Sequence, residues 1–308
     1  MNSENKAALN NKPSHRLSVI LVTMNRKDML KKCLESLFLQ NFIDYEVIIV
    51  DNASTDGTGE MVQCLFPDVL YVCLNANLGP PGGRNFGVRM ASGEICVFID
   101  DDARFNDHNA LEKIDAYFDA DQELGGLAFR IIRPQDGIEE YKSIPRVDKK
   151  IINEDYECSY FCGAGFALRH HIFSETGMFW EDLFFIGEEL ELSYRLIEKN
   201  YKIVRSYSIP VIHYETPQAR VPGKWIFYGA RNRLWIALRN LPWRYAVSHT
   251  LLWWGYYFIQ SLRNRHPIYF IQGVKDAVLG LPKAVRGRAC ISQNTIKKLK
   301  ILSGRVYY

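Results

Sequence analysis

Acidic side chains are almost absent from the last part of this 308-residue chain. Residues 220–308 hold 16 of the 38 lysines and arginines but a single acid, Asp276, so this stretch has a formal charge of +15. Residues 1–219 hold 22 basic and 34 acidic groups, a formal charge of −12. Such asymmetry is typical of a basic segment that meets an anionic surface.

A secretory leader and a disulfide framework are missing as well. Residues 1–16 are polar and contain no apolar core of a signal peptide, so we expect a cytoplasmic protein. The seven cysteines are scattered and odd in number, which favours free thiols in a reduced compartment. Cys158 and Cys162 have the spacing of half a metal site, but no second pair lies near them, so packing explains them better.

The two common glycine-rich phosphate loops are also absent. A dinucleotide-binding fold places G-x-G-x-x-G after its first strand, and a P-loop protein places G-x-x-x-x-G-K there. In this chain the first predicted strand, 17–23, is followed by Met24-Asn25-Arg26. This lack argues against nucleotidyl transfer, an alternative that also needs a metal and acidic residues. Glycines gather instead at 77–87, where they can equally shape a turn between a strand and a helix.

The first half alternates short β-branched runs with helical patterns, and the second half is more mixed. This spacing predicts an α/β fold with a parallel sheet, right-handed crossovers and helices on both faces. Asn106 is the expected N-cap of the first helix of the second half. Strands are predicted at 17–23, 46–50, 69–74, 95–99, 124–133 and 161–169, two short strands within 202–213, and helices over 27–39, 107–118 and 184–199.

Long aromatic and basic helices are predicted from residue 224 onward. The apolar run 246–262 contains Ser248, His249 and Gln260 and is slightly short for a membrane span. Aromatic residues flanked by lysine and arginine suit the headgroup zone of a bilayer, which favours an interfacial or re-entrant segment. A buried helical hairpin is the alternative.

Two acidic groups stand out within this pattern. The fourth strand runs into Asp100, Asp101 and Asp102, and adjacent carboxylates repel one another unless a cation lies among them. Ligands bind at the carboxyl ends of strands in open α/β sheets, so metal and phosphate chemistry is the first hypothesis. The second group, at 188–191, opens a predicted helix, where the helix dipole favours negative charge without any catalysis.

The ordered motifs resemble those of the family 2 glycosyltransferases over about residues 16–215. They are TMNR after the first strand, VDNASTDGT after the second, NLGPPGGRNFG, FIDDDA, GEELELSYRL and a final histidine, His213. The resemblance implies a GT-A fold with a mostly parallel central sheet and a C-terminal helical extension. We expect a flexible N-terminus at 1–15, a catalytic domain at 16–219 and a basic, aromatic helical region at 220–308.

The resemblance also implies an inverting, metal-dependent transfer of a sugar from a nucleotide-diphosphate sugar to a hydroxyl group. Bacterial rhamnosyl and hexosyl transferases of surface polysaccharide synthesis carry out such reactions. We therefore expect a glycan or lipid-linked acceptor and peripheral contact with the inner face of the cell membrane. No nucleic-acid partner is expected, because no recognition motif accompanies the basic residues.

By the family pattern, Asp100 lies toward the ribose and Asp102 holds Mn²⁺ or Mg²⁺. His213 is placed to join the metal shell, although a lone histidine at a strand end is also a common structural residue. Gly83 stands where the family usually has alanine. The residues expected to bind the nucleotide sugar are Thr23, Asn25, Arg26, Asp51, Asn77, Gly79, Arg84, Asp100 and Asp101.

Inversion needs one carboxylate to take the proton from the attacking hydroxyl. The family carries this base on the second acid of an E-D-x-D-like motif, which is Glu189 here. Glutamate is one methylene longer than aspartate, so the base is left open between Glu188 and Glu189. The same departure raises the alternative of a protein that binds sugar nucleotides without turnover. Trp180 and Glu191 are expected on the acceptor side, although Glu191 can instead pair with Arg195 one turn away.

Overall fold

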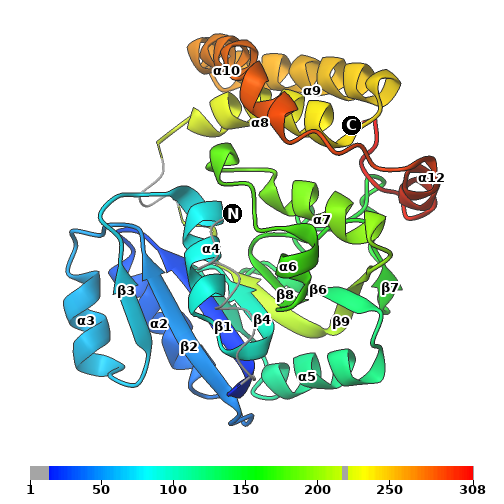
Figure 1. Cartoon of the computed structure of the whole chain (residues 1–308). Helices are drawn as coiled ribbons and strands as arrows, with labels where there is room; N and C mark the ends of the chain where they lie inside the picture. The colour runs from blue at the N-terminus through cyan, green and yellow to red at the C-terminus, as the bar shows by residue number, and fades with distance from the viewer. Residues whose placement is uncertain (1–13, 217–220, 308) are drawn as a thin grey trace.

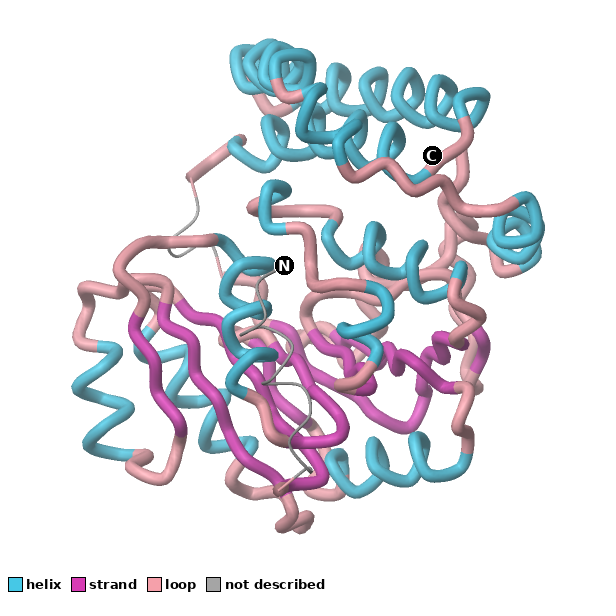
Figure 2. Tube along the Cα trace, in the orientation of Figure 1, coloured by secondary structure: helices cyan, strands magenta, loops and turns pink. Residues whose placement is uncertain are grey.

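The computed structural model describes residues 14–216 and 221–307. Residues 1–13, most of the N-terminal stretch expected to be flexible, lie outside the described part, and the first strand already begins at His15. One mixed sheet runs through the larger part of the chain in the order β3-β2-β1-β4-β8-β6-β9-β5, with β7 paired to β9 (Figures 1 and 2).

The first four strands form the parallel half of this sheet. They are β1 (His15–Thr23), β2 (Tyr45–Asp51), β3 (Leu70–Cys73) and β4 (Gly93–Ile99). All three pairings among them are parallel. The leucine and isoleucine side chains of β1, β2 and β4 are buried on both faces, as the near-continuous apolar runs predict, whereas Leu70 of the edge strand β3 is exposed. The carboxyl ends of these strands therefore meet at one edge of the sheet.

The remaining strands make the sheet mixed. They are β5 (Ala103–Phe105), β6 (Leu124–Ile132), β7 (Tyr156–Glu157), β8 (Gly165–Arg169) and β9 (Lys202–His213). Strand β8 is antiparallel to both β4 and β6, whereas β6 and β9 are parallel. Strand β5 is antiparallel to β9 and sets Ala103 opposite His213. This register brings a residue from late in the sequence to the three aspartates.

Helices cover both faces of the sheet. One hydrophobic core includes side chains of α4 (Gly79–Met90), α6 (Ile172–Thr176) and α7 (Glu188–Glu198). The other includes side chains of α2 (Lys27–Leu37), α3 (Thr58–Leu65) and α5 (Ala110–Ala120). Figure 1 shows α7 and α5 on opposite sides of the sheet. A short 3₁₀ turn, Glu181–Leu183, precedes α7.

Several predicted boundaries are wrong. Helix α2 ends at Leu37, which leaves Phe38 43% exposed, and the N-cap of α5 is Asn109 in place of Asn106. The strand predicted over 161–169 begins only at Gly165, and α7 is shorter than predicted because it begins at Glu188. The two short strands predicted within 202–213 are the single strand β9, whose pairing with β6 has shifts in register.

The glycines of 77–87 lie inside α4, so the alternative that they only shape a turn between a strand and a helix does not hold. A Cβ atom at Gly83 would lie 2.6 Å from Cγ1 of Val22, and one at Gly87 would lie 2.4 Å from Cγ2 of Ile20. The glycines thus let α4 pack directly against β1, at the cost of lower intrinsic helix propensity. This close approach fixes the position of Arg84, which lies between them on the same helix.

The C-terminal part of the chain is helical and lies beside α7 and α4 (Figure 1). Helices α9 and α10 pack on α8, and the outer face of α9 exposes large apolar side chains, so α9 is not a fully buried hairpin. Among residues 14–216 and 221–307, no helix combines the length and apolarity needed to cross a membrane. The helices are α8 (Lys224–Asn240), α9 (Trp243–Arg263), α10 (Pro267–Leu279), α11 (Leu281–Arg286) and α12 (Gln293–Ile301).

Candidate active site

Three predicted site residues meet just beyond the end of β4. Asp100, Asp102 and His213 each offer one ligand atom, and these atoms all lie within 4.8 Å of one another. The turn after Ile99 presents the aspartates, and the pairing of β5 with β9 brings His213 to them. Two carboxylate oxygens and an imidazole nitrogen form a donor set that suits a divalent cation such as Mn²⁺.

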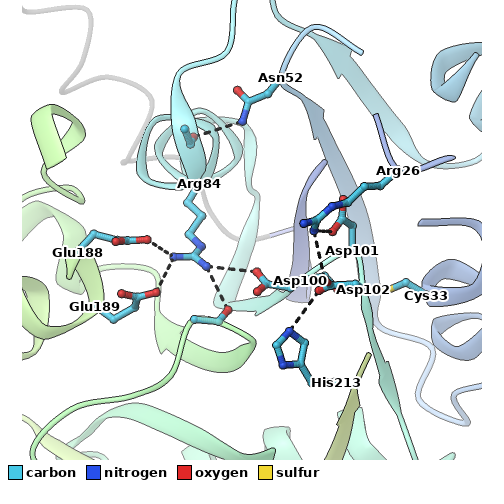
Figure 3. A network of polar contacts seen from close by, with 12 residues as sticks. Arg26, Cys33, Asn52, Arg84, Asp100, Asp101, Asp102, Glu188, Glu189 and His213 are labelled. Atoms are coloured by element: carbon cyan, nitrogen blue, oxygen red, sulfur yellow. Dashed lines mark hydrogen bonds and ion pairs between the residues drawn. The ribbon is translucent and has the colours of Figure 1, made fainter. Parts of the chain in front are cut away.

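A further acid, Glu140, orients the imidazole of His213. Its Oε2 lies 3.0 Å from Nδ1 of His213. Nε2 of His213 faces Oδ1 of Asp102 at 3.4 Å (Figure 3). A carboxylate on one ring nitrogen is the usual support for a metal-binding histidine. Burial alone would lower the pKa of His213, but hydrogen bonds to Asp102 and Glu140 raise it to about 10. Sequence analysis missed Glu140, which lies in a loop after β6 with no motif around it.

Asp101 points away from this cluster toward β1. Oγ1 of Thr23 donates to it at 2.8 Å, and Nη1 of Arg26 donates at 2.7 Å. Burial raises the pKa of Asp101 to about 6, even though the charge of Arg26 opposes that shift. Arg26 also lies 3.3 Å from Oδ2 of Asp102, so it connects the end of β1 to the metal-ligand cluster (Figure 3). That Thr23, Arg26 and Asp101 bind the nucleotide sugar stays a prediction.

The other residues predicted to bind the nucleotide sugar lie at the same sheet edge. Asp51 is fully buried at the end of β2 and accepts a 2.6 Å hydrogen bond from Oη of Tyr71, a residue that sequence analysis did not single out. Oδ1 of Asn25 accepts from the backbone of Thr55 at 2.7 Å. Oδ1 of Asn77 accepts from the backbone of Gly79 at 2.7 Å. These side chains hold the loops that frame the edge.

Gly79 lies where two of these loops meet. It has a φ of +71°, and a Cβ atom there would lie 2.0 Å from the backbone oxygen of Phe184. Any larger residue would therefore push the start of α4 away from the segment before α7. Glycine at this position brings the nucleotide-side loop against the loop that leads into the glutamates.

Arg84 connects the aspartates to the glutamates. Its Nη1 lies 3.1 Å from Glu188 and 3.3 Å from Glu189, and its Nη2 lies 3.4 Å from Asp100 and 3.1 Å from the backbone oxygen of Gly163 (Figure 3). The side chain is buried, so its charge acts at low effective dielectric. Arg84 thereby holds together acids that would otherwise repel one another.

The two candidate bases differ in access. The side chain of Glu188 is 3% exposed and that of Glu189 is 18% exposed. Burial, followed by the charge of Glu189, raises the pKa of Glu188 to about 8, so Glu188 is protonated at neutral pH. Gly163 makes room for the other carboxylate, because a Cβ atom there would lie 2.2 Å from Oε1 of Glu189. The accessible carboxylate is therefore Glu189.

The raised pKa of Glu188 makes stability depend on pH. Between the unfolded pKa of 4.5 and the folded value of about 8, the folded state holds a proton that the unfolded chain has lost, so stability falls as pH rises. Without metal or nucleotide sugar, Glu188→Gln is expected to unfold at a higher temperature than the unsubstituted protein at pH 8. This difference should grow between pH 4.5 and pH 8 and change little above pH 8. At pH 4 the advantage should vanish. Thermal unfolding across this range measures it, and an equal difference at pH 4 and pH 8 would contradict the assignment.

Two residues expected on the acceptor side, Trp180 and Glu191, are buried. Trp180 packs 5.9 Å from the ring of Trp235, with the guanidinium of Arg239 4.3 Å from its own ring. Glu191 is fully buried, and Arg195 donates to it at 2.5 Å. Both side chains stabilise the packing around α7, and their role on the acceptor side stays a prediction.

Helix α8 holds the loop that leads into α7. Nδ2 of Asn232 donates to the backbone oxygens of Leu183, Phe185 and Ile186 at 3.0, 2.7 and 2.7 Å. Phe184 and Ile186 have positive φ values of 59° and 70°, which non-glycine residues seldom adopt without support. The C-terminal helices thus position the segment immediately before the two glutamates, a link that the sequence alone did not indicate.

Comparison with known proteins agrees with this geometry. The model of the family described as "Glycosyl transferase family 2" matches residues 18–177. The GalNAc(5)-diNAcBac-PP-undecaprenol beta-1,3-glucosyltransferase of Campylobacter jejuni is 41% identical over 91 residues, 28% of this chain and 29% of that protein. The abequosyltransferase RfbV of Salmonella typhimurium is 37% identical over 118 residues, 35% of this chain and 34% of that protein. These matches thus span about a third of each relative.

Solved structures share the fold at low sequence identity. Staphylococcus aureus TarS superposes with a TM-score of 0.60 at 19% identity, covering 88% of this chain and 50% of that chain. The mannosyltransferase PcManGT of Pyrobaculum calidifontis, solved with GDP-Man and Mn²⁺, gives a TM-score of 0.56 at 18% identity, covering 97% and 81%. These likenesses confirm the predicted fold class.

Proposed function

Because this chain belongs to glycosyl transferase family 2, we propose that it moves a sugar from a nucleotide-diphosphate sugar to a hydroxyl of a glycan or lipid-linked acceptor, with inversion. The observation that carries this proposal is the convergence at one sheet edge. There Arg84 joins Asp100 of the candidate metal cluster to the accessible carboxylate of Glu189. A sugar bound between them would have its leaving diphosphate on one side and a base on the other.

Asp100, Asp102 and His213 are the residues that would hold Mn²⁺ or Mg²⁺. They fit such an ion because their ligand atoms lie within 4.8 Å of one another and because Glu140 fixes the ring of His213. Bound there, the ion would neutralise the charge that develops on the departing diphosphate. The donor is held by the surrounding loops, in which Arg26 lies closest to the cluster.

Glu189 takes the proton of the attacking hydroxyl. Its carboxylate reaches solvent and lies against Arg84, whereas that of its neighbour Glu188 is buried. One base is enough for inversion. The absence of a side chain at Gly163 leaves the space that glutamate, which is longer than the usual aspartate, needs at this position.

We also propose the division of labour along the chain. Residues 16–219 form the catalytic domain, and 220–308 form a basic helical region that meets the inner face of the cell membrane. The outer face of α9 exposes apolar side chains, and the region has a formal charge of +15, which together favour an anionic lipid surface. The exposed apolar residues of α9 include Val247, Leu251, Leu252, Phe258, Ile259 and Leu262. A lipid-linked acceptor, as named for the Campylobacter relative, would be reached from that surface.

Membrane contact gives a direct prediction. Replacing Leu251, Leu252 and Ile259 together by serine is expected to weaken binding to vesicles of phosphatidylcholine and phosphatidylglycerol at least about 10-fold, since each buried leucine-sized side chain contributes about 1.5–3 kcal/mol. Flotation measures this binding. The matched control is Ile43→Ser, which removes an exposed apolar side chain outside the C-terminal helices. Equal flotation of both variants would refute contact through α9.

The proposed activity is tested by offering a set of nucleotide-diphosphate sugars with Mn²⁺ and lipid extracts. Release of nucleotide diphosphate and a mass increase of one sugar on an acceptor are expected with one or a few donors, and EDTA should stop both. Tight, metal-dependent binding of a donor without any product would instead indicate a sugar-nucleotide-binding protein.

A further inference from the structure

A second group of basic side chains lies where the C-terminal helices meet the catalytic part. It comprises Arg233 of α8, His249 and Trp253 of α9, and Arg305 after α12, and we call it the Trp253 cluster. The guanidinium carbons of Arg233 and Arg305 lie 3.7 and 5.0 Å from the ring of Trp253. The ring centroids of His249 and Trp253 are 6.2 Å apart.

The Trp253 cluster has hydrogen-bond donors without acceptors. Within the described part of the chain, Nη1 of Arg233, Nε of Arg305 and Nε1 of Trp253 have no hydrogen-bond partner. Arg233 is only 7% exposed and His249 is fully buried. Buried polar groups are normally paired, so three such side chains in one place indicate a missing acceptor.

No carboxylate supplies that acceptor among residues 14–216 and 221–307. Neither Arg233 nor Arg305 forms an ion pair there, and the nearby acids Glu139, Asp148 and Glu157 are paired with other cations. The aromatic rings give cation–π contacts but no compensating negative charge. Leaving a buried guanidinium without a counter-charge is costly, which points to an anion from outside the described residues.

The Trp253 cluster adjoins the candidate active site. Arg305 lies 5.1 Å from the ring of Tyr160, whose hydroxyl accepts a 3.4 Å hydrogen bond from Nζ of Lys149. Burial and the charge of Arg305 lower the pKa of Lys149 to about 8, whereas Glu140, the partner of His213, raises it. Contacts therefore run from the Trp253 cluster through Tyr160 to Lys149, and the charge of Glu140, which supports the metal-ligand histidine, acts on Lys149.

Helix α9 presents two different faces at this point. Leu251 and Leu252 are exposed on its outer side, and His249, Trp253 and Tyr257 face the Trp253 cluster or the packing of α8. One helix therefore has an apolar surface suited to lipid and, one turn away, unpaired donors suited to an anion. Phosphate oxygens match guanidinium donors in charge and geometry.

We propose that the Trp253 cluster binds a phosphoryl group, namely the phosphate or diphosphate that joins the acceptor saccharide to its lipid. This inference rests on the proposed function, in which the lipid lies at α9 and the saccharide reaches Glu189. The phosphoryl group then fixes the acceptor between the membrane and the base.

Inorganic pyrophosphate is the probe for this site. Calorimetry in EDTA is expected to detect its binding to the full-length protein, and Arg305→Gln should weaken it at least 10-fold, as expected for the loss of one charged hydrogen bond. Arg233→Met, which keeps the buried stem volume, should do the same. Lys297→Gln, an exposed change of equal charge on α12, should leave the affinity unchanged. Retained donor binding with Mn²⁺ shows that each variant is folded, and if Arg233→Met does not fold, the half-exposed Arg305 decides alone.

Vesicles separate the two sources of such an anion. Phosphatidylcholine vesicles with a polyprenyl diphosphate should bind the protein at least 10-fold more tightly than vesicles of equal charge made with phosphatidylglycerol, and Arg305→Gln should remove this preference. Equal binding to both would overturn the acceptor assignment, and pyrophosphate affinity that is absent or insensitive to Arg305 would overturn the site. Neither assay needs turnover, so failed sugar transfer with intact pyrophosphate binding would reject only the proposed function.

Discussion

Asp102→Ala is expected to abolish metal-dependent binding of the nucleotide sugar. Asp102 is almost fully buried, faces His213 through Oδ1 at 3.4 Å and belongs to the cluster of three possible metal ligands. Removing a ligand of charge −1 should weaken Mn²⁺ binding by at least about 100-fold, because even supporting residues of metal sites account for 10- to 100-fold. Calorimetric titration of donor in Mn²⁺ and in EDTA should then give the same weak binding.

The matched comparison for this variant is Asp101→Asn. Asp101 is as buried as its neighbour Asp102, but its carboxylate accepts hydrogen bonds from Thr23 and Arg26. This change should weaken donor binding in Mn²⁺ and in EDTA by a similar factor and keep the ratio between the two conditions. If Asp101→Asn lost the Mn²⁺ dependence while Asp102→Ala kept it, the assignment of the metal ligand would be wrong.

Glu189→Gln is expected to lower kcat by about 10²- to 10⁴-fold, the range for loss of a general base. This corresponds to about 3–5 kcal/mol in the barrier. The affinity for the nucleotide sugar should stay within about 3-fold of that of the unsubstituted protein. Glu189 is linked to the residues that bind the nucleotide sugar through Arg84, and glutamine keeps the shape of the side chain. Steady-state rates of nucleotide-diphosphate release, with donor binding measured separately, test both statements.

Glu188→Gln distinguishes the two glutamates. Glu188 is buried and holds its proton at neutral pH, so an amide in its place changes little in the charge of the site. Its kcat should fall less than about 10-fold. A large loss in Glu188→Gln together with a small loss in Glu189→Gln would transfer the role of base to Glu188.

The sequence predicted the parts of this site that lie in one stretch or at strand ends. The buried runs before Thr23, Asp51 and Asp100 predicted parallel strands, and the common edge of such strands brought these residues together. The crowding of Asp100 and Asp102 predicted a cation. His213 reached them through the antiparallel pairing of β5 with β9, a register that no local pattern specifies.

The residues that sequence analysis missed act across the fold. Glu140 supports His213 from a loop 73 positions earlier, and Asn232 holds the backbone at 183–186 from a helix in another part of the chain. A lone acid or amide in an unremarked segment carries no local signal of such contacts. Conversely, the residue types of Trp180 and Glu191 suit an acceptor surface, and the sequence did not indicate that packing against Trp235 and Arg195 buries them.

The most direct test of the account is one titration of the nucleotide sugar into Glu189→Gln, with Mn²⁺ and with EDTA, alongside an assay of product. The nucleotide sugar should bind this variant tightly and only with Mn²⁺, and turnover should be at least about 100-fold lower than that of the unsubstituted protein. Binding that is indifferent to Mn²⁺, or turnover close to that of the unsubstituted protein, would contradict the division between a metal-held donor and a proton taken by Glu189.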